Sequence, residues 1–351
     1  MDHTGSRRTF IKNATLAGAG MALGLKARTL TLQPIHGDTP AGKRIGVIGL
    51  DTEHGPAFAR LLNAPDAPAA LGGFKIVAAT PRGSKDIRSS IDMIPRNTEA
   101  IKAQGVAIVN SISELIPLVD LVMLETNDGR LHLEQALPVF RAGKPMFIDK
   151  PIAASLKDTL SIYRAAEKYK VPVFSSSTLR YIPSVQEIVQ GKIGKVIAAD
   201  VFSPTPVEPT HPDLFWYGVH GVEMLYTLLG ADCRTVARTY TPLSDMVVGI
   251  WDDQRIGTLR GLRNNSWSFG GYVYGAGGQR ATLGDFTGYA PLVSAIIDFF
   301  KTGRSPVAKE QTIGAIAFME AAEISKQKNG AQIRIREIME SAEKESRKQP
   351  V

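Results

Sequence analysis

Cysteine is almost absent from this chain, since Cys233 is the only one among 351 residues. A single thiol cannot close an intrachain disulfide, and it cannot build a cysteine-based zinc site. This scarcity suits a cytosolic protein, and it equally suits a protein that folds before it is exported. Repeats and low-complexity segments are also lacking. The 44% apolar and 21% charged residues therefore describe an ordinary globular chain, long enough for two domains.

Neither sign of charge dominates once the first residues are set aside. The formal net charge is +7, and residues 1–37 contribute four of these charges through five cations and one anion. The remainder has no run of Lys and Arg interleaved with aromatic residues, so charge gives no indication of nucleic-acid binding. We expect a small-molecule ligand instead.

The N-terminus combines paired arginines, Arg7 and Arg8, with an uncharged stretch from Asn13 to Leu25. That stretch is shorter than the roughly 20 residues of a membrane-spanning helix. The segment resembles a twin-arginine export signal, so we expect residues 1–40 to be signal and linker and the protein to be periplasmic or otherwise extracytoplasmic, without a stable membrane anchor. The alternative is that the paired arginines occur by chance and precede an ordinary surface helix.

Residues 41–177 alternate between short apolar runs and helical patterns. The pattern predicts strands over 43–50, 74–79, 106–109, 119–125, 145–148 and 171–175, and helices over 56–62, 97–104, 113–117, 131–142 and 156–169. Strands that alternate with helices at this spacing form a parallel, doubly wound sheet. We therefore expect an N-terminal α/β domain of the Rossmann type.

From residue 178 the pattern changes. We expect a helix over 183–189, a strand over 195–202, then strands over 235–240, 245–251, 254–262 and 268–275 without helices between them, and two closing helices over 290–302 and 312–327. Successive strands without crossovers pair antiparallel. Residues 178–351 are therefore predicted to form an α+β domain with a largely antiparallel sheet.

A lysine stands where the fifth predicted strand ends. Residues 145–148 are apolar and lead directly into Asp149, Lys150 and Pro151. Ligands bind at the carboxyl ends of strands in open sheets of this kind. The alternative is that Lys150 is a solvated turn residue and Pro151 starts the next helix.

Four signals together resemble the glucose–fructose oxidoreductase / inositol dehydrogenase / MocA family. They are the strand and loop of residues 44–55, Asp149-Lys150-Pro151 for the family's Glu-Lys-Pro, Arg180-Tyr181 followed by Pro183, and Gly218-Val219-His220 followed by Leu228-Leu229-Gly230. The resemblance covers roughly residues 43–336. It implies an NAD(P)-binding domain, a substrate domain whose sheet mediates homo-oligomerisation, and hydride transfer between NAD(P) and a sugar or cyclitol carbinol.

The resemblance implies that Lys150 hydrogen-bonds the reacting hydroxyl and that His220 is the general base. These residue types suit the chemistry, because oxidation of a carbinol releases a proton and an ammonium group stabilises developing alkoxide charge. The alternative for His220 is a buried structural histidine on an apolar helix. A metal ion is not expected.

The glycine fingerprint of dinucleotide-binding turns is altered here. Gly49 is present, but Asp51 and His54 occupy the second and third glycine positions. A carboxylate at that point repels a pyrophosphate unless it turns to backbone N–H groups and caps the helix. After the second strand, Arg82 and Lys85 stand where an acidic residue would bind the ribose of NAD, which favours NADP.

A further departure lies before the histidine, where Trp216 replaces the family's frequent Asp. Trp216 shares a helix face with His220 if the helix extends that far, and it could stack on a sugar. Glu223, one turn after His220, could orient the imidazole, or it is an ordinary surface glutamate. Ser175–Ser177 lie at the domain junction, where they could meet substrate hydroxyls.

The complete expected site has two groups. For the cofactor it comprises Gly49, Leu50, Asp51, Thr52, His54, Thr80, Arg82, Ser84, Glu125, Thr126, Asn127, His132, Asp149 and Lys150, and for the substrate Arg180, Tyr181, Trp216, Tyr217 and Glu223. Two other functions stay open. One is a redox-neutral glycosidase or lyase on the same fold, and the other is a sugar-binding protein without a cofactor.

Overall fold

The computed structural model describes residues 39–263 and 267–351. The predicted export signal therefore lies outside the described residues, apart from its last two positions. Within the described ranges, no helix combines the length and apolar content needed to cross a membrane.

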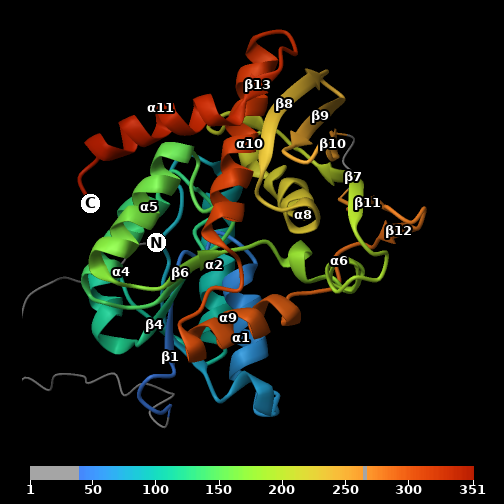
Figure 1. The fold of residues 1–351 in the computed structure, drawn as a ribbon. Coiled ribbons are helices and arrows are strands. Elements are labelled where there is room, and N and C mark those ends of the chain that lie inside the picture. The colour runs from blue at the N-terminus through green and yellow to red at the C-terminus, as the bar shows by residue number, and fades with distance from the viewer. Residues whose placement is uncertain (1–38, 264–266) are drawn as a thin grey trace, which may run out of the picture. The chain divides into compact units, whose positions relative to one another are not determined.

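A six-stranded parallel sheet forms the first half, in the order β3-β2-β1-β4-β5-β6 (Figure 1). Its strands are β1 Arg44–Ile48, β2 Lys75–Thr80, β3 Ala107–Ile108, β4 Leu121–Leu124, β5 Met146–Ile148 and β6 Val173–Ser175. Every pairing in it is parallel, and the central strands are almost wholly buried. This confirms the predicted doubly wound sheet, because parallel strands covered on both faces read as continuous apolar runs.

The helices of this half connect successive strands. They are α1 His54–Asn63, α2 Arg88–Lys102, α3 Ile112–Leu115, α4 His132–Arg141 and α5 Leu156–Tyr169, with short 3-10 turns η1 Ala69–Leu71, η2 Ile116–Leu118 and η3 Thr178–Tyr181. The strand order reverses between β1 and β4, which places a crevice at the carboxyl ends of these two strands. The predicted ligand-binding edge is therefore the edge at which Lys150 lies.

The second half holds a seven-stranded sheet in the order β12-β11-β7-β10-β9-β8-β13. Its strands are β7 Val196–Pro204, β8 Cys233–Tyr240, β9 Ser244–Trp251, β10 Ile256–Leu262, β11 Gly270–Gly275, β12 Arg280–Leu283 and β13 Ile333–Arg334. β10 pairs parallel with β7, and the other pairings are antiparallel. The sheet is therefore largely antiparallel, as predicted, but it is mixed at its centre.

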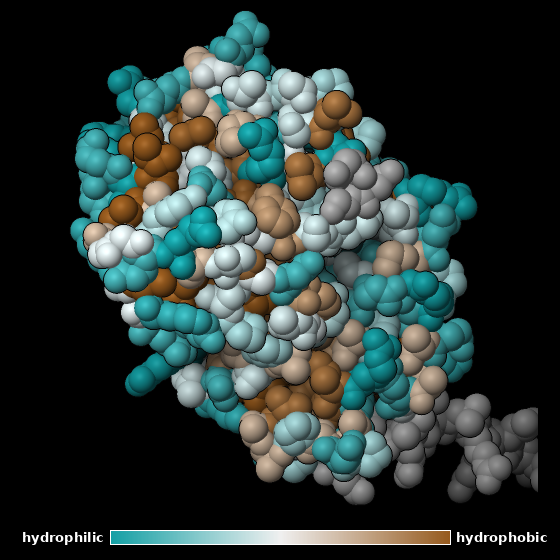
Figure 2. All heavy atoms as spheres, turned by 90° about the vertical axis from the view of Figure 1, so that its right-hand side faces the viewer, coloured by the Kyte–Doolittle hydropathy of each residue, from teal (hydrophilic) through white to brown (hydrophobic). Residues whose placement is uncertain are grey.

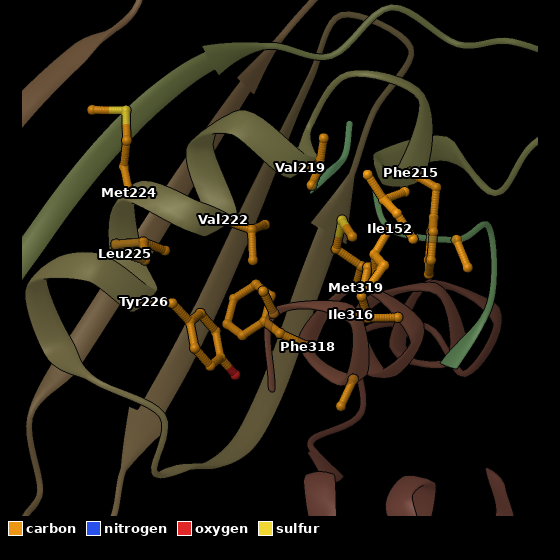
Figure 3. Packing of buried hydrophobic residues seen from close by; sticks show 14 of the residues in the cluster. Ile152, Phe215, Val219, Val222, Met224, Leu225, Tyr226, Ile316, Phe318 and Met319 are labelled. Atoms are coloured by element: carbon orange, nitrogen blue, oxygen red, sulfur yellow. The ribbon is translucent and has the colours of Figure 1, made fainter. Parts of the chain in front are cut away.

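One face of this sheet is covered by helices. The helices of the second half are α6 Pro183–Val189, α7 Asp213–Trp216, α8 Val219–Leu229, α9 Ala290–Thr302, α10 Lys309–Gln327 and α11 Ile335–Lys348. Figure 3 shows Val222 and Tyr226 of α8 packed toward Ile316, Phe318 and Met319 of α10 in the core beneath the sheet. This packing fixes the rotation of α8, and with it the direction of His220.

The C-terminal helices return to the first half of the chain. Ile296 of α9 packs in one core cluster with Phe58 of α1 and Phe174 of β6. In α10, Glu320 accepts the backbone N–H of Leu156 at 2.6 Å. The division of the chain at residue 177 stays a prediction, and these contacts hold the two halves of the site together.

Candidate active site

A cavity of about 290 Å³ opens at the carboxyl edge of the parallel sheet. This volume is at the lower end of the range for small-molecule sites. Both halves of the chain line the cavity, through Asp51, Thr52, Glu53, His54, Met93, Asn127, Asp149, Lys150, Thr178, Leu179, Tyr217, His220, Trp267, Phe269, Phe286 and Tyr289. Lys150 and His220, seventy positions apart in the sequence, therefore face one crevice.

His220 lies in the first turn of α8, and its imidazole is 6% exposed. Its Nδ1 is 2.7 Å from the Oγ of Ser177, which also accepts the backbone N–H of Leu179. A serine oxygen has two lone pairs, so we assign Nδ1–H as a second donor to it, which leaves the lone pair on Nε2. Burial, with the nearby Lys150 ammonium, holds the pKa of His220 well below 6.5. The ring is therefore a neutral base.

Ser177, rather than Glu223, is the direct partner of His220. Glu223 accepts the backbone N–H of Ser177 and lies 3.6 Å from the Nη2 of Arg180. Arg180 in turn donates to Gln311 at 2.8 Å. Glu223 and Arg180 thus form a buried pair behind Ser177, and Glu223 acts on His220 only through that serine.

Trp216 does not share a helix with His220. α7 ends at Trp216 and α8 begins at Val219, because Tyr217 and Gly218 interrupt the helix. The indole packs on His211 with ring centroids 5.2 Å apart, and His211 Nε2 is 3.2 Å from Asp128 Oδ1. Trp216 therefore supports His211, which contacts Asp128 of the first half of the chain, while its neighbour Tyr217 lines the cavity.

The turn after β1 keeps two functions of the glycine fingerprint. Gly49 has φ 98°, and a Cβ there would lie 2.3 Å from the backbone N of Thr126, so only glycine permits this approach of the two strand ends. A Cβ on Gly55 would lie 3.1 Å from Leu50, so Gly55 allows the close packing of α1 on β1. Close helix–strand packing is the task of the third fingerprint glycine.

Asp51 turns beneath this loop instead of toward the cavity mouth. Its Oδ1 accepts the N–H of Asn127 at 3.0 Å, and its Oδ2 accepts the N–H of Ser84 at 3.2 Å. The carboxylate thus ties together the chain after β1, β2 and β4, and it does not cap α1 as its position suggested. Burial raises the pKa of Asp51 to about 6, although these hydrogen bonds oppose the shift.

His54 turns toward two buried carboxylates. Its Nδ1 is 2.8 Å from Asp149 Oδ2 and 3.4 Å from Glu125 Oε2, while its ring stacks on Phe58 and meets the edge of Tyr289. Burial lowers the pKa of His54, but the attraction of Asp149 and Glu125 outweighs it and raises the pKa to about 9. Burial raises the pKa of Glu125 to about 7. His54 and Lys150 keep the pKa of Asp149 low despite its burial.

The remaining predicted residues lie around the cavity without lining it. Thr80 is fully buried, Ser84 Oγ donates to Asp86, Thr126 Oγ1 donates to Gln135, and Arg82 is exposed. Both ring nitrogens of His132 lie against backbone carbonyls, those of Ile152 and Thr126. Leu50, Glu125, Arg180, Tyr181 and Glu223 also stand outside the lining. His132 therefore connects the start of α4 to the backbone carbonyls of Thr126 and Ile152, and it does not line the cavity, where we had predicted cofactor contact.

Several aromatic walls of the cavity were not predicted. Phe269, Phe286 and Tyr289 come from loops and strand ends of the second half, and Tyr217 packs against His220 and Phe269. Their segments carry no motif, so only the folded chain brings them here.

The residues present fit a dinucleotide. The Asp51 carboxylate is fully buried and already bonded, so it leaves the start of α1, an anion-favouring helix N-terminus, for a pyrophosphate. Thr52 and Asn127 line the cavity beside it, and the exposed cations Arg82 and Lys85 follow β2, where the adenosine ribose would lie. Lys150 and His220 stand at the opposite end, where the nicotinamide would meet a substrate.

Comparisons with known proteins agree with this fold. Residues 43–177 match the model of a family described as an oxidoreductase family with an NAD-binding Rossmann fold. A 1,5-anhydro-D-fructose reductase from Ensifer adhaerens is 36% identical over 107 residues, which is 29% of this chain and 32% of the reductase. An uncharacterized oxidoreductase from Streptococcus pneumoniae is 26% identical over 164 residues, 41% of this chain and 44% of that protein. The chain thus matches less than half of these relatives' lengths.

Solved structures share the fold over most of the chain. A probable dehydrogenase from Thermotoga maritima superimposes with a TM-score of 0.69 at 20% identity, covering 84% of this chain and 99% of that one. A scyllo-inositol dehydrogenase from Lactobacillus casei, solved with NAD(H) and scyllo-inositol, gives a TM-score of 0.66 at 15% identity, covering 84% and 99%. At these identities the likeness shows the fold alone.

Proposed function

We propose that this chain is an NAD(P)-dependent member of the glucose–fructose oxidoreductase / inositol dehydrogenase / MocA family of oxidoreductases, whose model matches residues 43–177. Its substrate is a CH–OH group of a sugar or cyclitol, and its cofactor stays tightly bound. Two similar proteins, the anhydrofructose reductase and the scyllo-inositol dehydrogenase, are named for substrates of this class.

The observation that carries the proposal is the shared cavity of Lys150 and His220. A bound nicotinamide supplies the hydride acceptor. His220, neutral through its burial, accepts the hydroxyl proton at Nε2, and the ammonium of the buried residue Lys150 donates a hydrogen bond to the same oxygen as negative charge develops on it. Ser177 holds the imidazole in the orientation and tautomer that this transfer needs.

The test is a screen of sugars and cyclitols with NAD and NADP, followed by single variants. Lys150→Met and His220→Ala should each lower kcat/KM by about 10²- to 10⁴-fold. Lys144→Met is the matched control, because Lys144 precedes the same strand β5 and donates to the carbonyl of Val119 at 2.6 Å, away from the cavity lining. Wild-type kcat/KM in either cavity variant would refute the assignment. Aglycone release without net reduced cofactor would instead identify the redox-neutral glycosidase or lyase.

We further propose that the chain is exported through the twin-arginine route. The proposal rests on Arg7 and Arg8, which precede an uncharged segment. Residues 1–40 fused to a reporter that functions only after export should carry it out of the cytoplasm, and replacement of both arginines by lysine should retain it inside. Equal export of both fusions would contradict the proposal.

We also propose homo-oligomerisation through the face of the second sheet opposite to the one on which α8 and α10 pack. Ile197, Ile256 and Tyr272 are 44%, 45% and 44% exposed on strands β7, β10 and β11. Figure 2, which views the molecule from this side, shows hydrophobic groups separated by hydrophilic residues. Light scattering should find an oligomer for the wild type and a smaller species for Ile256→Lys with Tyr272→Lys. A monomeric wild type would refute the proposed oligomerisation.

A further inference from the structure

Three potential metal ligands converge from three neighbouring strand ends. His54 follows β1, Glu125 follows β4 and Asp149 follows β5. These strands are adjacent in the parallel sheet, so their carboxyl ends meet at one edge. One imidazole nitrogen and one oxygen from each carboxylate all lie within 4.8 Å of one another.

The two carboxylates lack the partners that buried carboxylates normally have. Glu125 is 0% exposed and Asp149 is 1% exposed, and none of their four oxygens accepts a well-aligned hydrogen bond from any residue in 39–263 or 267–351. Their close neighbours are ionic, namely His54 and Lys150, the latter 3.7 Å from Asp149. Asp51 on the same edge contrasts with them, because backbone N–H groups bind both of its oxygens. Buried carboxylate oxygens that have ionic neighbours but no aligned hydrogen bond can accept a further ligand at the site.

We propose that His54, Glu125 and Asp149 bind a divalent first-row metal ion, such as Mn²⁺ or Zn²⁺, beside the cavity. One imidazole nitrogen and two carboxylate oxygens without sulfur suit these ions. An ion with bonds of about 2.1 Å separates neighbouring tetrahedral ligands by about 3.4 Å. The His54 Nδ1 distances of 2.8 and 3.4 Å approach this spacing.

The imidazole is held in the orientation that this site requires. Phe58 stacks on the His54 ring at 5.5 Å, and Tyr289 meets its edge at 4.9 Å, so packing directs Nδ1 toward the carboxylates. Supporting contacts of this kind fix metal ligands before the ion arrives.

The ion would have coordination positions open to a ligand. Three protein ligands leave at least one position free, as in catalytic rather than structural sites. His54 and Asp149 line the cavity together with Lys150 and His220, while Glu125 closes the site from the buried side. The open positions therefore face the cavity, where a hydroxyl or carbonyl oxygen of a sugar or cyclitol can coordinate. This site goes beyond the proposed hydride transfer and does not depend on it.

The test measures metal binding by the full chain, independently of turnover. Protein stripped with a chelator and then dialysed against Mn²⁺ or Zn²⁺ should retain one ion per chain by elemental analysis, and Mn²⁺ titration followed by electron paramagnetic resonance should give one tight site. Glu125→Gln, Asp149→Asn and His54→Phe should each weaken binding by more than about 100-fold. Glu53→Gln is the matched control, because Glu53 lines the same cavity but pairs with Arg96 outside the cluster. It should bind the ion within about threefold of the wild type.

Thermal unfolding provides a second readout that separates binding from misfolding. Added Mn²⁺ should raise the unfolding temperature of the wild type and leave that of Glu125→Gln unchanged.

The proposal is overturned if the stripped wild type binds no stoichiometric ion, or if the three cluster variants bind it as the wild type does. It is also overturned if added Mn²⁺ leaves the unfolding temperature of the wild type unchanged, or raises that of Glu125→Gln by the same amount. NAD(P) binding is measured on the same metal-free protein. Dinucleotide binding without metal binding removes this inference alone, and the reverse result removes the proposed function alone.

Discussion

Asp51 provides the most quantitative test of how the altered glycine turn works. Its carboxylate is fully buried and accepts two backbone hydrogen bonds, one from the chain after β2 and one from the chain after β4. Burial nevertheless raises its pKa from 3.8 to about 6. The charged form is therefore destabilised in the folded protein. Replacing Asp51 with Asn removes the charge and retains one acceptor oxygen.

The size of the effect follows from linkage between folding and proton binding. A shift from 3.8 to about 6 corresponds to about 3 kcal/mol at 1.36 kcal/mol per pKa unit. Between these two values the folded state binds more protons than the unfolded state, so the stability contributed by this group falls as pH rises. The wild type should lose about 3 kcal/mol relative to Asp51→Asn between about pH 4 and pH 7, with most of the change below pH 6. The hydrogen bond lost in the variant does not titrate, so it leaves this slope unaltered.

The assay is urea unfolding followed by far-ultraviolet circular dichroism at a series of pH values. This signal reports both halves of the chain, whereas all three tryptophans lie in the second half. Asp120→Asn is the control of opposite sign, because hydrogen bonding to Arg44 lowers the pKa of Asp120. Its stabilising effect is lost only as pH falls below the unfolded value, so its difference from wild type should stay constant above about pH 5.

The reasoning about Asp51 is refuted by a particular result. If the difference between wild type and Asp51→Asn is the same at all pH values, the carboxylate is not strained by burial. If the wild type gains stability relative to Asp51→Asn as pH rises, the two backbone hydrogen bonds to the carboxylate outweigh its desolvation. The ionised form of Asp51 would then stabilise the folded protein.

Three further predictions concern the cavity and the turn. In Glu125→Gln, which lacks the neighbouring carboxyl group with a pKa of about 7, the pH profile of kcat/KM should stay flat from about pH 8 to 6.5, because burial and Lys150 hold the pKa of His220 well below 6.5, and a decline centred near 6.5 would contradict this. Gly49→Ala should destabilise the protein by about 3 kcal/mol or more and abolish NAD(P) binding in calorimetry, whereas Gly42→Ala, at φ 85° in open space, should cost about 1 kcal/mol. Arg82→Ala should weaken NADP binding about tenfold and leave NAD unchanged, and equal losses would contradict the preference for NADP.

Most of the parallel sheet could be predicted from the sequence because its strands are short apolar runs that alternate with helices. The errors fall where a local rule misled. α2 begins at Arg88, whereas the sequence predicted a start at residue 97. The prediction was wrong because Pro95, a residue type that usually marks a helix boundary, lies inside this helix. α11 was not predicted, since most of its residues are exposed and its apolar face is narrow. β13 has only two residues, too few for any periodicity.

The candidate site divides in the same way. Lys150 and His220 stand in short motifs that resemble a known family, and this resemblance predicted them; the structure places both on one cavity. Ser177 was expected to meet substrate hydroxyls, and the structure instead places it against His220. Phe269 and Tyr289 have no sequence signal, because their positions arise from packing between distant segments. Trp216 was expected beside His220 on the assumption of a continuous helix, but the chain breaks between α7 and α8.

The altered glycine turn has one physical explanation for both of its unusual side chains. Glycine at these positions normally leaves space for a pyrophosphate and for close packing of the helix. Here Gly55, one position later, permits the packing. Asp51 and His54 both direct their polar groups inward, one to the backbone after β2 and β4, the other to Glu125 and Asp149. The first arrangement is complete, because every strong acceptor has a donor. The second arrangement leaves the buried oxygens of Glu125 and Asp149 without hydrogen bonds, so we expect a further ligand to bind beside His54.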